Sequence, residues 1–306
     1  MEHTPELKKA LAELKRVTGD ILDISPVVGC DADLALEQIR SLLAAYKEKY
    51  NKTHFLQGLL TGELSAFESA THAKRLHLDP DEPRILLLIE TKGSNNHDTV
   101  MEILKNLFPS RAKTHLVPIS VQQIAVLKPV KSALEDMQAL CRTIVDTLNT
   151  EALVPAVIAH SNTILSLHEL SSAFQESALA LQIGKLFFPN QEIFSHAKLG
   201  VGRLIYKLPL SVCEEFLKEI FGGEIPDTFE EEAMHVIHTF IQNNLNIAET
   251  ARQLHMHRNT LIYRLEQMEE RTGLNLRIFE DAMTFKIANM VMAFRRCKKT
   301  APPSNL

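Results

Sequence analysis

Residues 246–272 read NIAETARQLHMHRNTLIYRLEQMEERT, and this stretch has the pattern of a helix-turn-helix. Asn246 is a favourable N-cap for a first helix, and Glu249 stands three residues later, as in a capping box. The turn reads HMH, and we expect a positive φ angle at His255, where many such turns carry glycine. A second amphipathic helix follows, with apolar residues at helical spacing: Leu261, Ile262, Leu265 and Met268.

The start of the second helix carries polar groups that suit contact with DNA. The free N–H groups of a helix N-terminus favour a phosphate, arginine can pair with guanine, and asparagine can pair with adenine. Double-stranded DNA is therefore the predicted partner, and the predicted contacts are His257, Arg258, Asn259, Thr260, Tyr263 and Arg264. An alternative stays open, in which Asn259 and Thr260 only form hydrogen bonds at the helix end and Tyr263 only packs.

Two runs in this region resemble a known family. The run LHMHRNTLIYRLEQMEERTGLNL, residues 254–276, resembles the C-terminal DNA-binding domain of the PucR/CdaR group of bacterial transcriptional regulators. The run FEDAMTFKIANMVMAF, residues 279–294, resembles the helix that closes that domain. The resemblance implies a regulator of purine catabolism or carbohydrate-diacid use, acting as an activator, with RNA polymerase as a candidate further partner.

The segment before residue 64 is helical in pattern. Its apolar residues form two stripes, one of Leu7, Leu11 and Leu14 and one of Ile39, Leu42, Leu43 and Tyr46. Residues 42–65 resemble the linker that precedes the central domain in this family. Such a helix could pack on its own chain, but we favour pairing with a second subunit, because helix-turn-helix proteins commonly bind two half-sites as dimers. The segment is too short for the diacid-recognition domain of longer members, so no particular effector is implied.

The middle of the chain, from about residue 83 to residue 208, alternates strands and helices in the order β-α-β-β-α-β. The expected strands are 84–90, 115–119, 123–128, 154–160 and 192–194, and the expected helices are 98–108, 132–149 and 167–187. This order is typical of a ferredoxin-like or cyclase-like α/β sandwich. It resembles the degenerate GGDEF-like domain of PucR/CdaR regulators.

That resemblance raises a nucleotide cyclase as a third function class. The hairpin of a diguanylate cyclase needs glycines beside the nucleotide and acidic residues for metal ions. Here residues 114–129 read THLVPISVQQIAVLKP, without glycine or carboxylate, and the first strand carries the single carboxylate of Glu90 near its end. One carboxylate is a poor two-metal site. We therefore predict no catalytic residues, no cofactor and no metal site.

Charge and cysteine content fit a cytoplasmic DNA-binding protein. The formal net charge of the 306 residues is −5, but from Asn246 onward ten Lys and Arg stand against six Asp and Glu. The rest of the chain carries 23 against 32, so a basic module follows an acidic body. The four cysteines are scattered, and neither a secretory signal nor a membrane-spanning run is expected. Arg295, Arg296, Lys298 and Lys299 form a basic tail that could touch phosphates or be only a solvated helix end.

The predicted fold class is α+β, with N-terminal helices, a central GGDEF-like α/β sandwich and an all-α C-terminal helix-turn-helix domain. The predicted domains are 1–79 for dimerisation, 80–222 for the α/β domain and 223–300 for DNA binding, with a tail at 301–306. The predicted protein is a cytoplasmic transcriptional regulator that controls a metabolic operon in response to a small molecule, as a homodimer or higher oligomer. The alternative is a ligand- or protein-binding sensor with a vestigial DNA module.

Overall fold

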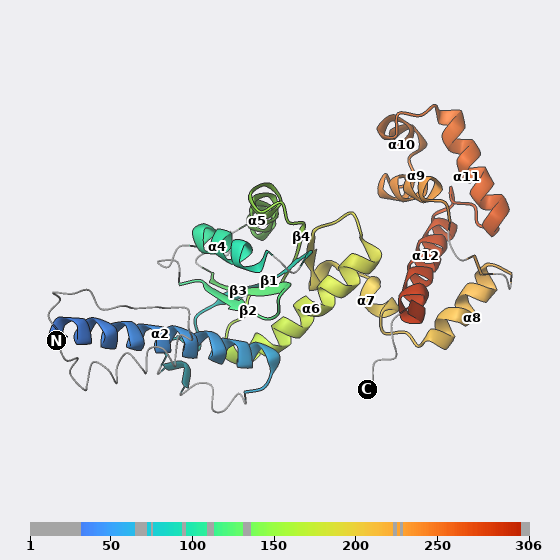
Figure 1. The fold of residues 1–306 in the computed structure, drawn as a ribbon. Helices are drawn as coiled ribbons and strands as arrows, with labels where there is room; N and C mark the ends of the chain where they lie inside the picture. Colours follow the sequence, from blue (N-terminus) through green and yellow to red (C-terminus); the bar gives the residue numbers. More distant parts are fainter. Residues whose placement is uncertain are drawn as a thin grey trace. The chain divides into compact units, whose positions relative to one another are not determined.

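The computed structural model describes residues 32–64, 72–74, 76–93, 96–108, 113–130, 136–222, 225–226 and 229–300 (Figure 1). The chain divides into two compact units. The first comprises Met1–Leu181 and Glu192–His196, and the second comprises Gln182–Gln191 and Ala197–Leu306. The expected leucine stripe near the N-terminus and the expected tail lie outside the described residues.

In its described residues, the first unit is an α/β sandwich around a five-stranded sheet with the order β2-β3-β1-β4-β5. Neighbouring strands are antiparallel except for β4 and β5, which are parallel. The strands are β1 Arg84–Thr91, β2 His115–Pro118, β3 Gln123–Pro129, β4 Ala156–His160 and β5 Ile193–Ser195. The helices are α2 Ala32–Thr61, α4 His97–Leu107, α5 Met137–Glu151 and α6 Leu170–Phe187, with short 3₁₀ turns at Leu167–Glu169 and His196–Lys198.

The central strand β1 explains why the sheet has helices on both faces. Its residues from Arg84 to Ile89 are all buried, as expected for a strand that is covered on both sides. Ile85, Leu87 and Ile89 pack in one core with α4 and α5. Those two helices lie together on one face of the sheet, and α6 lies on the other (Figure 1). The predicted β-α-β-β-α-β order and the α+β fold class are confirmed.

Some predicted boundaries in this unit were wrong. The described part of α5 begins at Met137 because the Asp136 carboxylate accepts hydrogen bonds from the N–H groups of Gln138 and Ala139, which caps the helix there. The long helix begins at Leu170, after a 3₁₀ turn that Ser166 caps. Each difference follows from a local side-chain cap that periodicity alone does not reveal.

The described part of the second unit is all α-helical, around a core rich in phenylalanine. Its helices are α7 Gly202–Ile205, α8 Leu210–Ile220, α9 Glu231–Gln242, α10 Ile247–Gln253, α11 Arg258–Thr272 and α12 Phe279–Thr300. Phe229, Phe240, Phe285 and Phe294 are buried in one core. The end of α6, including Leu186 and Phe187, packs against the same core, so the two units divide within α6. The predicted domain boundaries near residues 79 and 222 remain a proposal.

The predicted apolar stripe of the N-terminal helix is only partly correct. Ile39 and Leu43 of α2 are buried, as that stripe requires, but Leu42 is 56% exposed. Leu36, one turn before Ile39, is also buried. Leu36, Ile39 and Leu43 are therefore the buried apolar residues described in this part of α2. Dimerisation through α2 remains a proposal.

His115 on β2 predicts a pH-dependent stability of the first unit. Burial, followed by the charges of Lys52 on α2 and Arg84 on β1, lowers the pKa of His115 from 6.5 to about 4. Between these pH values the unfolded chain binds a proton that the folded chain does not, so the free energy of unfolding falls as the pH falls from 6.5 to about 4. Thermal unfolding across this window should therefore show a steeper loss for the wild type than for His115→Gln. Parallel curves would contradict this origin of the pH dependence.

Candidate DNA-binding site

The turn between α9 and α10 is held by two asparagines. Asn246 is the N-cap of α10, as predicted, and its side-chain oxygen accepts a hydrogen bond from the Glu249 N–H at 3.1 Å. The other half of the predicted capping box is wrong, because the Glu249 carboxylate pairs with Arg252 instead. Asn243, which the sequence did not single out, donates to Gln253 at 2.8 Å and to the buried Thr250 hydroxyl at 3.3 Å. These bonds tie the end of α9 to α10.

The turn between α10 and α11 has the expected left-handed residue. His255 has a φ angle of 51°, in the region that glycine and a few polar residues tolerate best. The turn is closed by a hydrogen bond of 3.0 Å from the Met256 N–H to the Ala251 carbonyl. Ala251 is buried in the core shared with Leu261 and Leu265, so its small side chain lies where the two helices meet.

His257, rather than Asn259 or Thr260, forms the side-chain cap of the recognition helix α11. The His257 backbone is extended, and its Nδ1 accepts a hydrogen bond from the Asn259 N–H at 3.2 Å. This arrangement requires the imidazole tautomer whose proton is on Nε2. None of the hydrogen bonds among the described residues uses the side chain of Asn259 or Thr260. The helix-end role considered for those two side chains is therefore not seen, and both remain exposed.

Packing determines which face of α11 is turned outward. Leu261, Leu265 and Met268 form the buried stripe, so Asn259 and Tyr263 lie on the opposite side of a helix with 3.6 residues per turn. Tyr263 is 59% exposed. Of the six predicted contact residues, five are exposed: His257, Arg258, Asn259, Thr260 and Tyr263.

The sixth predicted residue, Arg264, is half-buried and has an intramolecular partner. Its Nη2 atom donates to the Glu232 carboxylate of α9 at 2.6 Å. Two helical turns further along α11, the Arg271 guanidinium lies over the Phe229 ring, 5.5 Å from its centroid. The same guanidinium lies 3.8 Å from the Glu230 carboxylate. Any contact between Arg264 and DNA must therefore compete with Glu232.

Charge is distributed unevenly along α11. Its first two turns carry Arg258 and Arg264 and no carboxylate, whereas its second half carries Glu266, Glu269 and Glu270. Arg277 partly neutralises the second half, because its guanidinium lies 3.7 Å from Glu266 and 3.4 Å from Glu269. A polyanion is therefore favoured at the N-terminal half of the helix, where the helix dipole also attracts negative charge.

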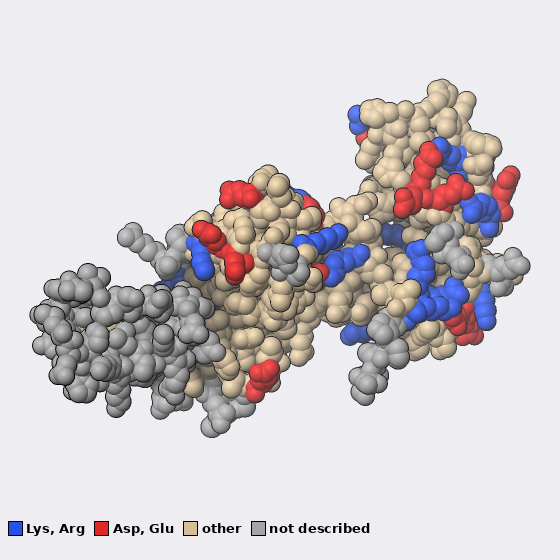
Figure 2. All heavy atoms as spheres, in the orientation of Figure 1, with Lys and Arg blue, Asp and Glu red and all other residues tan. Residues whose placement is uncertain are grey.

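The predicted basic tail is largely occupied within its own unit. Arg295 and Lys299 both pair with Glu214 of α8, and the Lys299 hydrogen bond is the main cause of a lowered Glu214 pKa. Lys298 lies over the rings of Tyr206 and Phe294. Basic side chains gather over α8 and α12 with an acidic group among them (Figure 2). These contacts give the tail a role in holding α12 against α8.

Among the described residues, no group of three or more His, Cys, Asp or Glu side chains is arranged to hold a metal ion. In the α/β unit, Glu90 stands opposite Gln123, whose amide donates to the Glu90 carboxylate at 3.0 Å. None of the helices in the described ranges is both long and apolar enough to cross a membrane.

The two units match known domain families. Residues 233–291 match the PucR C-terminal helix-turn-helix domain, and residues 61–183 match the GGDEF-like domain. The purine catabolism regulatory protein of Bacillus subtilis (strain 168) is 31% identical over 129 residues, which is 42% of this chain and 24% of that protein. The carbohydrate diacid regulator of Escherichia coli (strain K12) is 21% identical over 268 residues, which is 84% of this chain and 69% of that protein.

The chain was also matched to a solved structure, the regulator of polyketide synthase expression from Bifidobacterium adolescentis. The match covers 93% of this chain and 98% of that chain. Its sequence identity is 15% and its TM-score is 0.37, which does not establish a shared overall fold.

The helical geometry and the domain match together define a protein with a helix-turn-helix DNA-binding domain. Within that class, the chain is similar to PucR/CdaR transcriptional regulators over these two domains, and the predicted resemblance is confirmed. Its matched stretch spans about a quarter of the purine catabolism regulatory protein.

The His257 cap predicts a change in stability that is separate from DNA binding. His257→Ala should lower the free energy of unfolding by about 0.5–2 kcal/mol, because the Asn259 N–H loses its acceptor. His257→Asn should retain most of the stability, since asparagine is a strong N-cap residue. Denaturant unfolding of both variants checks this. Equal stability of the alanine and asparagine variants would show that the cap contributes little.

Proposed function

We propose that this protein is a DNA-binding transcriptional regulator that controls a metabolic operon in response to a small molecule. The observation that carries the proposal is the outward-facing N-terminal half of α11, which combines exposed hydrogen-bonding side chains with positive charge. The identities of the two relatives, a purine catabolism regulator and a carbohydrate diacid regulator, support metabolic control.

In the proposed complex, α11 enters the major groove with its N-terminus first. Arg258 lies at the tip of the helix, and Asn259 and Tyr263 lie opposite the buried stripe, so these side chains face the bases. His257 and Thr260 lie beside the tip, where they can meet phosphates. The acidic second half of α11 would be repelled by the DNA backbone, which disfavours docking of the helix along its whole length.

The assembly and cellular setting belong to the same proposal. A homodimer or higher oligomer would present two recognition helices to two half-sites. We further propose cytoplasmic location, transcriptional activation and contact with RNA polymerase, in keeping with the family. A sensor with a vestigial DNA module is the alternative, and it predicts that the exposed residues of α11 have no measurable effect on DNA binding.

We also propose that the GGDEF-like domain does not act as a nucleotide cyclase. The hairpin between β2 and β3 offers neither glycine nor carboxylate, and the nearby Glu90 carboxylate is hydrogen-bonded to Gln123. A two-metal phosphoryl-transfer site needs several carboxylate ligands around bound nucleotide. The domain is better suited to assembly or to ligand-controlled signalling.

The proposed interface predicts a strong effect of salt on DNA binding. If about six phosphates are neutralised, the affinity should fall roughly 10³-fold between about 50 and 200 mM salt, because condensed counterions are released on binding. Titration of the full-length protein with duplex DNA from the promoter regions of its own gene and of neighbouring genes measures this dependence. A flat salt response, or no binding to any of these fragments, would contradict DNA binding.

The proposed roles within α11 predict different effects of two kinds of substitution. Arg258→Ala and Asn259→Ala should each reduce the ratio of specific to random-sequence affinity by about 1–3 kcal/mol, the cost of one good base contact. Arg296→Ala is the matched control, because this exposed residue lies near the end of α12 and should not affect the ratio. An unchanged ratio in both α11 variants, with their folds intact, would remove the base-contact assignment.

The ion pair between Arg264 and Glu232 predicts a variant that binds DNA more tightly. Glu232→Gln removes the competing carboxylate and frees Arg264 for a phosphate. Since an exposed pair is worth at most about 1 kcal/mol, the gain should be no more than about fivefold. Glu231→Gln makes the same charge change one residue away, at an exposed glutamate. An equal gain in both variants would show that only the overall charge matters.

A further inference from the structure

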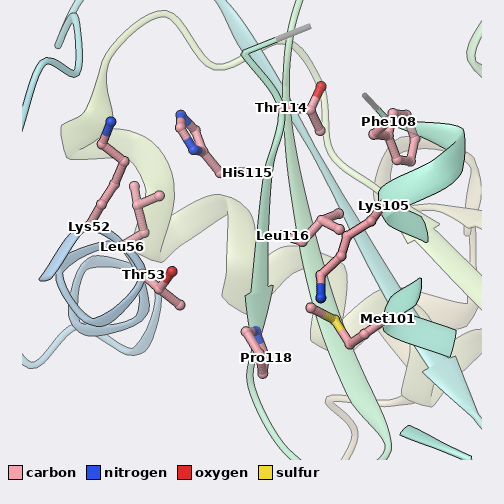
Figure 3. A pocket seen from close by; sticks show the side chains of 10 residues that line it. All are labelled: Lys52, Thr53, Leu56, Met101, Lys105, Phe108, Thr114, His115, Leu116 and Pro118. Atoms are coloured by element: carbon pink, nitrogen blue, oxygen red, sulfur yellow. The ribbon is translucent and has the colours of Figure 1, made fainter. Parts of the chain in front are cut away.

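A cavity of about 380 Å³ lies at the free edge of the sheet in the α/β unit. It is lined by residues of α2, α4 and β2 and of the segments that border α4 and β2. Among the described strands, β2 is the end strand of the sheet and pairs with β3 alone. Figure 3 shows β2 running between the side chains from α2 and those from α4. The volume is within the range of small-molecule sites.

The lining of this cavity is positively charged. Its described residues include the ammonium groups of Lys52 of α2 and Lys105 of α4 beside the neutral imidazole of His115 on β2, and none of these described residues is a carboxylate. Among the described residues, neither lysine has a carboxylate within ion-pair distance. Lys52 is close enough to His115 to disfavour protonation of the imidazole. Two ammonium groups without counter-charges make the cavity attractive to an anion.

The cavity also offers polar groups that lack partners. The Thr114 hydroxyl is buried without a hydrogen-bond partner among the described residues, which is costly unless a ligand or water completes it. The Ile119 N–H bonds to Gln123 of β3, so alternation along an antiparallel pair turns the Leu116 N–H toward the open edge. Pro118, two residues after Leu116, has no N–H to donate and so disfavours the pairing of another strand at this edge.

The remaining walls are apolar. Leu56 of α2, Met101 of α4, Phe108 and the Leu116 side chain also line the cavity. A fully hydrated inorganic ion would leave this surface unused. A molecule with one oxyanion group and a compact apolar body would pair with the lysines and also cover the apolar walls.

We propose that this cavity binds a small organic anion, a carboxylate or phosphate ester with an apolar body, through Lys52, Lys105 and the Leu116 N–H. The ligand bridges α2 and α4 across the edge of β2. It therefore fixes the position of the last turns of α2 relative to the sheet. The role of this cavity as the small-molecule input to gene control rests on the proposed function. Binding of the anion itself does not require DNA.

The experiment uses the full-length protein in the absence of DNA, and the probe is phenyl phosphate. Inorganic phosphate and phenol, which represent the two halves of the probe, serve as comparison ligands. Calorimetric titration at low salt should show binding of phenyl phosphate that is tighter than binding of either half. Lys52→Gln and Lys105→Gln should each weaken it about tenfold, as expected for the loss of a charge-assisted contact. Lys92→Gln is the control, because this exposed lysine of the same unit does not line the cavity.

A second readout reports on the cavity directly. Bound anion should raise the pKa of His115 from its value of about 4, which NMR of the imidazole protons can follow. No binding of phenyl phosphate at millimolar concentration, or equal binding by all three lysine variants, would overturn the proposal. The proposal would also be overturned if phenol bound as tightly as phenyl phosphate. Because no DNA is present, this result is independent of whether the protein binds an operator.

Discussion

The burial of one apolar stripe on α11 is the constraint on which the DNA-binding unit depends. Leu261, Leu265 and Met268 share a core with Phe240 of α9 and Phe285 of α12. Burying three large side chains contributes several kcal/mol, at about 1.5–3 kcal/mol for each, and any rotation of α11 about its axis would lose part of it. The stripe therefore sets the outward face, and the position of Asn259 and Tyr263 follows from it.

Local hydrogen bonds then set where the recognition helix begins. His255 takes a left-handed conformation, and His257 caps α11. Asn243 joins α9 to α10 through its side-chain amide. Because these contacts lie within the motif, the tip of α11 is held before any ligand arrives. A preordered tip lowers the entropy cost of binding.

The sequence predicted the helices of this motif well, because helical periodicity and capping residues are local signals. It predicted the Asn246 cap and the positive φ angle at His255 for the same reason. It missed the pairing of Arg264 with Glu232, since 32 residues separate them and only the packing of α9 on α11 brings them together. The binding of Arg295 and Lys299 to Glu214 was missed for the same reason.

In the α/β unit, strand order along the chain was predictable, but side-chain environments were not. The exposed Leu42 lies within an apolar pattern that suggested burial. The cavity beside β2 is also invisible in the sequence, because Lys52, Lys105 and His115 are brought together from three separate elements. Residue type indicated what chemistry was missing, namely the cyclase carboxylates. It did not indicate that the two lysines would share a space with His115.

The most direct test of the DNA-binding account is amide NMR of the isotope-labelled full-length protein, titrated with a bound duplex. We predict that the largest chemical-shift changes fall at residues 257–264, with smaller changes in the acidic second half of α11. Changes concentrated in α12 or in the α/β unit, with residues 257–264 unaffected, would contradict it.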